Sequence, residues 1–387
     1  MDPNSLIPHY PALPFPAPLW LLQTLLVLGF FLHLIPMNLV LGGGLGASLF
    51  LFIGRKNQSS YSFRIGHSLA SALPLFISFA ITQGIVPLLF LQLLYGPMFY
   101  TSSILMAAPW FSIIFFLLIA YYSSYLVIYR YLHRSDSGVK APLILFCASL
   151  IFIGIAYLFA SNMTLMLQPE KWLSIYQHNA QGLNLPHDRQ ILPRLLHSLV
   201  GALAVGGLAV GCFGLSNKSD KNYADWLIKK GSLIFLLFSL LQIPVGLQFL
   251  SSLPPTLQAK FLGQDQLGSI VFASSMGLAL LSILSAAFTL SQASRVAFKA
   301  TILFATLTIF DMVMTRHLLR TFSLANYISP EKVPVNTQWD LLGIFVLSAV
   351  GLIIYLVWLL RLLVSSNAAA ARAIIENTET SLESGRA

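Results

Sequence analysis

The sequence predicts an all-α membrane protein with about nine transmembrane helices. Hydrophobic residues make up 57% of the 387 residues, charged residues only 9%, and the mean hydropathy is +0.78. This composition excludes an ordinary soluble globular protein. Apolar stretches of about 20 residues or more recur between short polar loops, and each can cross a hydrocarbon layer of about 30 Å as a helix. Helices are expected because backbone polar groups in lipid must be satisfied within the segment.

The apolar stretches define the expected elements in order along the chain. The first is too long for one crossing, so we expect it to protrude from the membrane or to break near Gly42–Gly46. Together the spans form one transmembrane helical domain over residues 1–365, followed by a cytoplasmic tail over 366–387 that is rich in Ala, Ser and Glu. The nine predicted spans are 18–53, 66–95, 103–129, 141–167, 191–215, 226–250, 268–293, 298–320 and 339–363.

The distribution of basic residues predicts the orientation of these spans. With the N-terminus outside, the inner segments hold 15 Lys and Arg residues and the outer segments 7. Basic residues are enriched on the cytoplasmic side of membrane proteins, so the prediction is N-out and C-in. The net charge of +9 therefore follows from topology and does not indicate a nucleic-acid partner. Residues 1–17 carry no basic segment typical of a signal peptide.

Polar residues inside the spans are the candidate functional residues, because the sequence has no P-loop, dinucleotide-binding, metalloprotease or nucleophile-elbow motif. Four potential haem ligands lie 18 to 22 residues from the inner basic residues of their spans, about 27 to 33 Å along a helix. They therefore share one layer near the outer face, as axial ligation from facing helices requires. No CxxCH motif is present, which excludes covalently bound c-type haem. The four are His33, His197, Met276 and His317.

Each of these residues also has a simpler interpretation. His33, in "FFLHLIPMNLVLGGGLG", is a haem or metal ligand, a proton-carrying group, or a histidine that hydrogen-bonds a neighbouring helix. Met276, taken alone, is better explained as a residue that fills a gap in helix packing. Asp311 is the sole acidic residue well inside a span. It is a functional-site candidate because a carboxylate inside a membrane is energetically costly. It carries a proton, pairs with an arginine, or bonds Ser or Thr hydroxyls on an adjacent helix.

Two arginines near the outer end of the eighth span are candidates for binding haem propionates. Arg316 and Arg320 are four residues apart and so lie on one helix face. A guanidinium matches the geometry of a carboxylate, which favours contact with propionates. The alternative is that both arginines anchor the helix among lipid headgroups.

Several short segments resemble segments of the haem-bearing subunit, subunit I, of the cytochrome bd quinol oxidases, and they occur in the same order and in the same predicted topology. "FFLHLIPMNLVLGG" is similar to the family's first-helix histidine segment, and "AITQGIVPLLFLQLLYG" to its second-helix glycine and glutamine segment. "AAPW" resembles the start of the third helix and "SNMTLMLQP" the end of the fourth. "LHSLVGALAVGG" is similar to the fifth-helix ligand segment, and "SSMGLALLS" to the seventh.

The resemblance implies a ligand set. In this family pattern His197 and Met276 hold a low-spin haem b, and His33 ligates a second haem. The oxidases use a carboxylate on helix eight for another haem, and in "VMTRHLLR" His317 stands in its place. The resemblance therefore implies two or three haem b groups.

Departures from the family pattern affect the expected function. The third-helix carboxylates that serve proton entry in the oxidases align roughly with Ile113 and Tyr121. The long outer quinol loop is reduced to about 251–267, and the string GRQPW is missing. The chain is therefore interpreted as a short, divergent member that carries electrons and does not reduce oxygen.

The expected function is that of a cytochrome b in the cytoplasmic (inner) membrane of a bacterium. It would move electrons between the quinone pool and a c-type cytochrome or iron–sulfur protein at the outer face, alongside other membrane subunits of a respiratory complex. One alternative is a divergent bd-type terminal oxidase. Another is a transporter or anchor subunit without cofactor, in which Asp311 and the histidines form a proton or substrate path.

Overall fold

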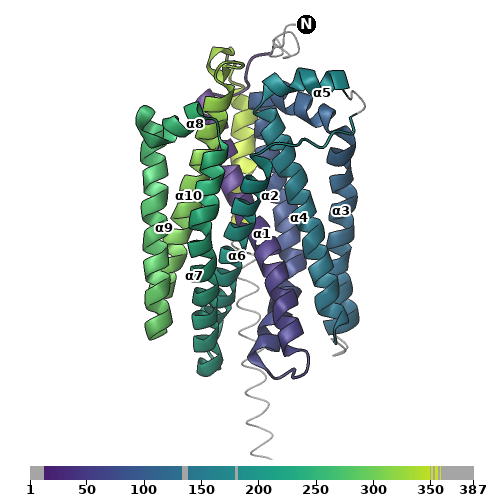
Figure 1. The fold of residues 1–387 in the computed structure, drawn as a ribbon, viewed down its shortest axis with the longest axis vertical. Coiled ribbons are helices and arrows are strands. Elements are labelled where there is room, and N and C mark those ends of the chain that lie inside the picture. Colours follow the sequence, from purple (N-terminus) through teal and green to yellow (C-terminus); the bar gives the residue numbers. More distant parts are fainter. Residues whose placement is uncertain are drawn as a thin grey trace, which may run out of the picture. The chain divides into compact units, whose positions relative to one another are not determined.

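The structure, a computed structural model, describes residues 13–132, 138–178, 182–348, 350–351, 354–355 and 358. The chain divides into a large unit that spans residues 20–333 and a smaller one formed by 13–19 and the residues from 334 onward. In the described part, eight helices are long and apolar enough to cross a membrane (Figure 1). The prediction of an all-α, multi-pass membrane protein is confirmed.

Long helices of the large unit run side by side, and their connections lie at the two ends of the bundle (Figure 1). The short helices α5 (Trp172–His178) and α8 (Pro255–Ala259) belong to the outer connections of the predicted orientation. π-Helical turns at Val127–Leu132 extend α3. The long helices are α1 (Leu19–Gly54), α2 (Tyr61–Leu105), α3 (Ala107–Leu126), α4 (Lys140–Met166), α6 (Ile191–Ser216), α7 (Lys221–Ser252), α9 (Gln266–Gln292) and α10 (Arg295–Leu324).

The first helix differs from one of the two expectations stated for it. α1 continues through Gly42–Gly46 without a break, and its 36 residues extend about 54 Å. The prediction of a break there is wrong. Gly42 instead lets two helices cross closely, because a Cβ at this position would overlap the carbonyl oxygen of Ala202 on α6.

The second helix is longer than predicted. The span expected at 66–95 extends to Leu105, and the loop expected before residue 103 is helical. Tyr95 interrupts α2 with non-helical dihedral angles (φ −133°, ψ 29°), two residues before Pro97. Proline lacks the N–H that would continue the helical hydrogen bonds and clashes with the preceding turn, which accounts for a kink at this point.

The smaller unit contains the start of the ninth predicted span. Phe15 pairs with the segment around Val335 through hydrogen bonds from Phe15 N to Pro334 O (2.8 Å) and from Asn336 N to Phe15 O (2.9 Å). A helix then covers 339–348. Most of the remainder of the span at 339–363, and the tail predicted at 366–387, lie outside the described residues.

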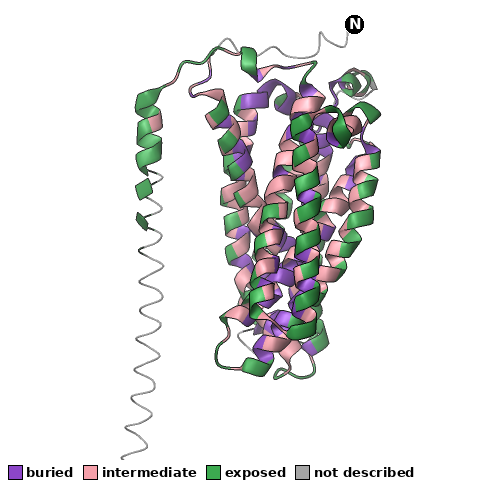
Figure 2. Ribbon diagram, turned by 90° about the vertical axis from the view of Figure 1, so that its left-hand side faces the viewer, coloured by how far each residue is buried: buried purple, intermediate pink, exposed green. Residues whose placement is uncertain are grey.

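Burial in the large unit follows the demands of a lipid environment. Small and apolar residues are buried in the core, whereas α3, α7 and α9 each carry several exposed Leu or Ile side chains. Along the long helices, buried residues alternate with intermediate and exposed ones (Figure 2). Glycines allow α6 and α7 to pack closely, since a Cβ on Gly207 would lie 2.6 Å from the backbone nitrogen of Phe235. This tight packing holds α6 and α7 as one support for the site described below.

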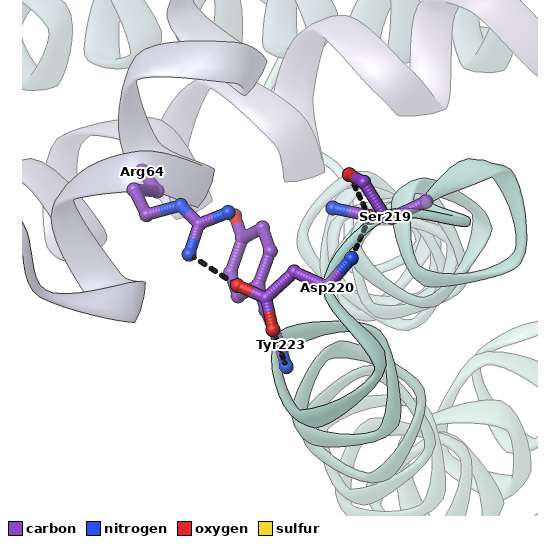
Figure 3. Close-up of polar contacts among 5 residues, drawn as sticks. Arg64, Ser219, Asp220 and Tyr223 are labelled. Carbon is purple, nitrogen blue, oxygen red and sulfur yellow. Dashed lines mark hydrogen bonds and ion pairs between the residues drawn. The ribbon is translucent and has the colours of Figure 1, made fainter. Parts of the chain in front are cut away.

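An ion pair joins α2 to the start of α7 at the inner end. Arg64 Nη1 lies 2.8 Å from Asp220 Oδ2, and its guanidinium carbon lies 3.8 Å from the centre of the Tyr223 ring (Figure 3). Asp220 also caps α7 by accepting a hydrogen bond from Tyr223 N (3.0 Å). The hydrogen bond from Arg64, together with that from the Tyr223 amide, holds the pKa of Asp220 below its usual value.

Candidate functional site: a cavity between α1, α6, α7, α9 and α10

A mainly apolar cavity of about 370 Å³ lies within the large unit, between α1, α6, α7, α9 and α10. Two of the four predicted ligands line it: His197 from α6 and Met276 from α9. Phenylalanines 30, 235, 249, 261 and 272 contribute aromatic surface. A concave apolar site with few polar groups is typical of a binding site for a small molecule or a cofactor.

The imidazole of His197 lies against α7. If Gly246 carried a Cβ, that atom would be 3.4 Å from His197 Cε1 and 3.5 Å from Nδ1, so the glycine leaves the space that the ring edge faces. His197 Nδ1 is buried and has no hydrogen-bond partner. Gln242, one turn before Gly246, donates a hydrogen bond from Nε2 to the backbone oxygen of His197 (2.8 Å).

Met276 faces the same cavity and is 44% exposed in the chain. A methionine that fills a gap in helix packing is enclosed by its neighbours. The exposure of Met276 therefore does not match the packing interpretation, and its side chain is accessible to an occupant of the cavity.

Three arginines lie at the outer end of this region, of which Arg320 is buried and the other two are half-buried. Arg194 and Arg316 line the cavity, and Arg320 is 9% exposed on the following turn of α10. Each guanidinium faces an aromatic ring: Arg194 with Phe249 at 5.2 Å, Arg316 with Phe30 at 4.3 Å, and Arg320 with Tyr95 at 5.4 Å. Arg194 Nε and Nη2 and Arg320 Nη1 are buried without a hydrogen-bond partner.

No carboxylate in the described part of the chain forms an ion pair with these arginines, since the two ion pairs found there are Arg64–Asp220 and Lys171–Asp188. Asp188 attracts Arg194 electrostatically, but its carboxylate is bonded to Lys171. Burial raises the pKa of Asp188, but the contacts with Lys171, with the amide of Gln190 and with Gln168 together outweigh this effect and lower the pKa overall. Unpaired buried cations are costly, so the arrangement fits an anionic ligand with carboxylates. The burial of Arg320 also differs from the exposure expected of a headgroup anchor.

The other two predicted ligands are not among the residues that line the cavity. His33 Nδ1 lies 2.9 Å from Ala80 O on α2, and its ring rests against Gly84, where a Cβ would be 2.9 Å from Cε1. The interpretation as a histidine that hydrogen-bonds a neighbouring helix is therefore met. The same bond, with Nδ1–H as donor, leaves Nε2 available, as in metal-ligating histidines. His317 Nδ1 is buried without a partner, and Arg320 acts on it electrostatically.

Asp311 keeps an unpaired carboxylate oxygen. Its Oδ2 is buried without a hydrogen-bond partner. Thr315 Oγ1 donates to the backbone oxygen of Asp311 (2.9 Å) and not to its carboxylate. Within the described residues, neither an arginine nor a Ser or Thr hydroxyl bonds the carboxylate, so the two pairing interpretations are not seen.

Sequence reasoning did not single out three residues of the site: Arg194, Gln242 and Gly246. Arg194 is one of the seven basic residues of the predicted outer segments, and its spacing of three before His197 in "RLLH" places both on one helix face. Gln242 is an amide inside an apolar span, in "SLLQIPVG", which is a usable signal. Among the described residues, no three His, Cys, Asp or Glu side chains form a group that could hold a metal ion.

Comparison with known proteins supports the fold. No protein-family model matches the sequence, and no curated protein does. Among solved structures, a chain of the bd oxidase from Geobacillus thermodenitrificans superposes with a TM-score of 0.61. The match covers 88% of this chain and 97% of that chain at 14% sequence identity. The predicted bd-type fold is therefore confirmed, and at this identity the likeness concerns the fold alone.

Proposed function

We propose that the chain is a membrane cytochrome b, with a haem b held in the cavity by His197 and Met276. The observation that carries the proposal is that these two side chains, 79 positions apart in the sequence, line one apolar cavity from different helices. An imidazole and a thioether would together suit an iron that exchanges single electrons. The bound haem would supply that one-electron chemistry.

The arginines support the same proposal. A haem b carries two propionates, and Arg194 and Arg316 lie at the cavity wall without an acidic partner of their own. Charge-assisted hydrogen bonds to propionates would compensate the burial of these cations. In the predicted orientation, Arg194 and Arg316 would hold the propionates at the outer end of the site, and the phenylalanine rings that line the cavity would contact the apolar part of the haem.

A second haem, and a third if the chain binds three, would use His33 and His317 as ligands. The bond of His33 to Ala80 O supports a ligating role for its remaining nitrogen. His317, with a buried unpartnered Nδ1, supplies a further imidazole. Asp311 is proposed as a proton-linked group, because its carboxylate oxygen is buried and unpaired.

The electron route proposed for the chain runs between the quinone pool and a partner at the outer face, a c-type cytochrome or iron–sulfur protein. The position of His197 two turns from the outer start of α6 supports this, because short distances favour transfer to a docked partner. The proposed setting is the cytoplasmic membrane of a bacterium, within a respiratory complex of several membrane subunits.

A bd-type terminal oxidase is the second candidate, and the likeness in fold to the bd oxidase of Geobacillus thermodenitrificans favours it. Against it, Tyr121 stands where the resemblance places a proton-conducting carboxylate, and its hydroxyl bonds Ser78 (2.5 Å) and Tyr125 (3.3 Å). A third candidate, the transporter or anchor subunit, has no cofactor.

A pyridine haemochrome spectrum of the purified chain tests the proposal. Haem b at one or more equivalents per chain is the expected result, and a chain purified without haem b contradicts it. Exposure of the reduced protein to carbon monoxide separates the two haem-bearing candidates. An unchanged spectrum is expected of an electron carrier, whereas a carbon monoxide adduct would favour the oxidase.

A further inference from the structure

His197 and Gln242 face each other across α6 and α7, and each side chain lies beside a glycine of the opposite helix. Gly201 follows His197 by four residues, and a Cβ there would lie 3.2 Å from Gln242 Nε2. Gly246 follows Gln242 by four residues, and a Cβ there would lie 3.5 Å from His197 Nδ1. The two glycines therefore make room for an imidazole and an amide in the same interhelical layer.

Two atoms of this layer are left without partners, and they are complementary. Gln242 Nε2 is already bonded to the backbone oxygen of His197, whereas Gln242 Oε1 and His197 Nδ1 are both buried and unpaired. A side-chain amide oxygen accepts only, and Nδ1 of a neutral imidazole donates in one of its two tautomers. Hydrogen-bond partners decide the tautomer of a histidine, because hydrogen positions follow the surrounding network.

We propose that Gln242 is the positioning residue of His197, whose Nδ1–H donates to Gln242 Oε1 while Gln242 Nε2 holds the backbone of the same residue. Gly201 and Gly246 leave space beside the two side chains in which this contact can form. The bond selects the Nδ1–H tautomer, so that Nε2 carries the lone pair needed to bind iron. The inference rests on the proposed function, since it assigns His197 as an iron ligand.

The contact has an electronic consequence that a merely structural glutamine would not have. An acceptor on Nδ1–H raises the electron density of the imidazole and so stabilises ferric more than ferrous iron. Removal of the acceptor is therefore expected to weaken haem binding and to raise the reduction potential. Partners of this kind contribute about 10–100-fold to metal affinity.

The experiment compares three variants of the full chain by haem occupancy and by potentiometric titration of the low-spin haem. Gln242→Leu removes the acceptor at similar size and is expected to raise the midpoint by about 59 mV, the equivalent of a tenfold change for one electron. Gln242→Glu keeps an acceptor oxygen, and haem retention with a midpoint at or below that of the wild type is expected. Gln248→Leu is the matched control, because Gln248 is exposed on the same helix.

Unchanged potentials in Gln242→Leu, or an upward shift in Gln242→Glu, would overturn the inference. If Gln242→Leu does not fold, the inference is still tested by the direction in which Gln242→Glu shifts the midpoint potential relative to the control. If the wild type contains no haem b, the proposed function fails separately. The inference is then read from ¹⁵N histidine resonances of the wild-type chain, where the Nδ1–H tautomer of His197 is expected and the Nε2–H tautomer contradicts it.

Discussion

Replacement of Arg194 by Met is expected to change the apo-protein and the haem-loaded protein in different ways. The guanidinium is buried, and its Nε and Nη2 atoms have no hydrogen-bond partner in the chain. Methionine keeps much of the apolar length and removes the charge. A buried charge without a partner costs free energy, so its replacement by an apolar side chain of similar length is expected not to destabilise the apo-protein. Haem affinity, in contrast, should fall because a propionate loses its cationic partner.

The size of the loss follows from the type of contact. A hydrogen bond to a charged group contributes about 1.5–3 kcal/mol to binding. Since about 1.4 kcal/mol corresponds to a factor of ten, haem affinity should fall by about 10- to 150-fold. The gain in stability of the apo-protein is reduced by Asp188. This carboxylate is bonded to Lys171 but also attracts Arg194 from a distance, and that attraction is lost in the variant.

The assay needs both states of the protein. The apo-chain is produced in a host that cannot synthesise haem, its thermal midpoint is measured in detergent, and its affinity is measured by titration with haem b. Arg189→Met is the control, since Arg189 is an exposed arginine of the neighbouring outer loop. A fall in the thermal midpoint of the Arg194→Met apo-protein with unchanged haem affinity would refute the reasoning, because it would assign Arg194 a structural role. If Arg194→Met and Arg189→Met changed the thermal midpoint and the haem affinity equally, that result would refute the reasoning as well.

The remaining predictions concern the axial ligands and the inner ion pair. His197→Ala should abolish one low-spin haem signal in the optical spectrum, and an unchanged spectrum would refute the ligand assignment. Met276→His should retain haem with a lowered midpoint, because a second imidazole favours ferric iron relative to a thioether; an unaltered or raised midpoint counts against Met276. Asp220 has a lowered pKa, so its contribution to stability is present above pH of about 4 and is lost as the pH falls further. Asp220→Ala should therefore lower the thermal midpoint at pH 7 and reduce its decline in acid, and an acid response equal to that of the wild type would contradict the role of the Arg64 pair.

The sequence by itself determined the helices and their order. A helix that crosses a bilayer needs about 20 apolar residues, and basic residues are enriched on the cytoplasmic side. Each segment meets these requirements on its own, so its helix can be recognised without knowledge of its neighbours. The sequence also predicted a shared depth for His197 and Met276, because depth is a count of residues along a helix of fixed rise. The break expected in α1 was wrong because Gly42 serves a helix crossing, which is a property of two segments.

Tertiary structure alone decided which of the outer-layer residues meet. Depth does not determine the direction in which a side chain points, and rotation of each helix is set by packing against its neighbours. This packing brings His197 and Met276 to one cavity and leaves His33 bonded to α2 and His317 outside the cavity lining. It also gives Arg194 and Gln242 their significance, since a buried cation without an acid, or an amide facing an imidazole, exists only once helices distant in sequence are placed together.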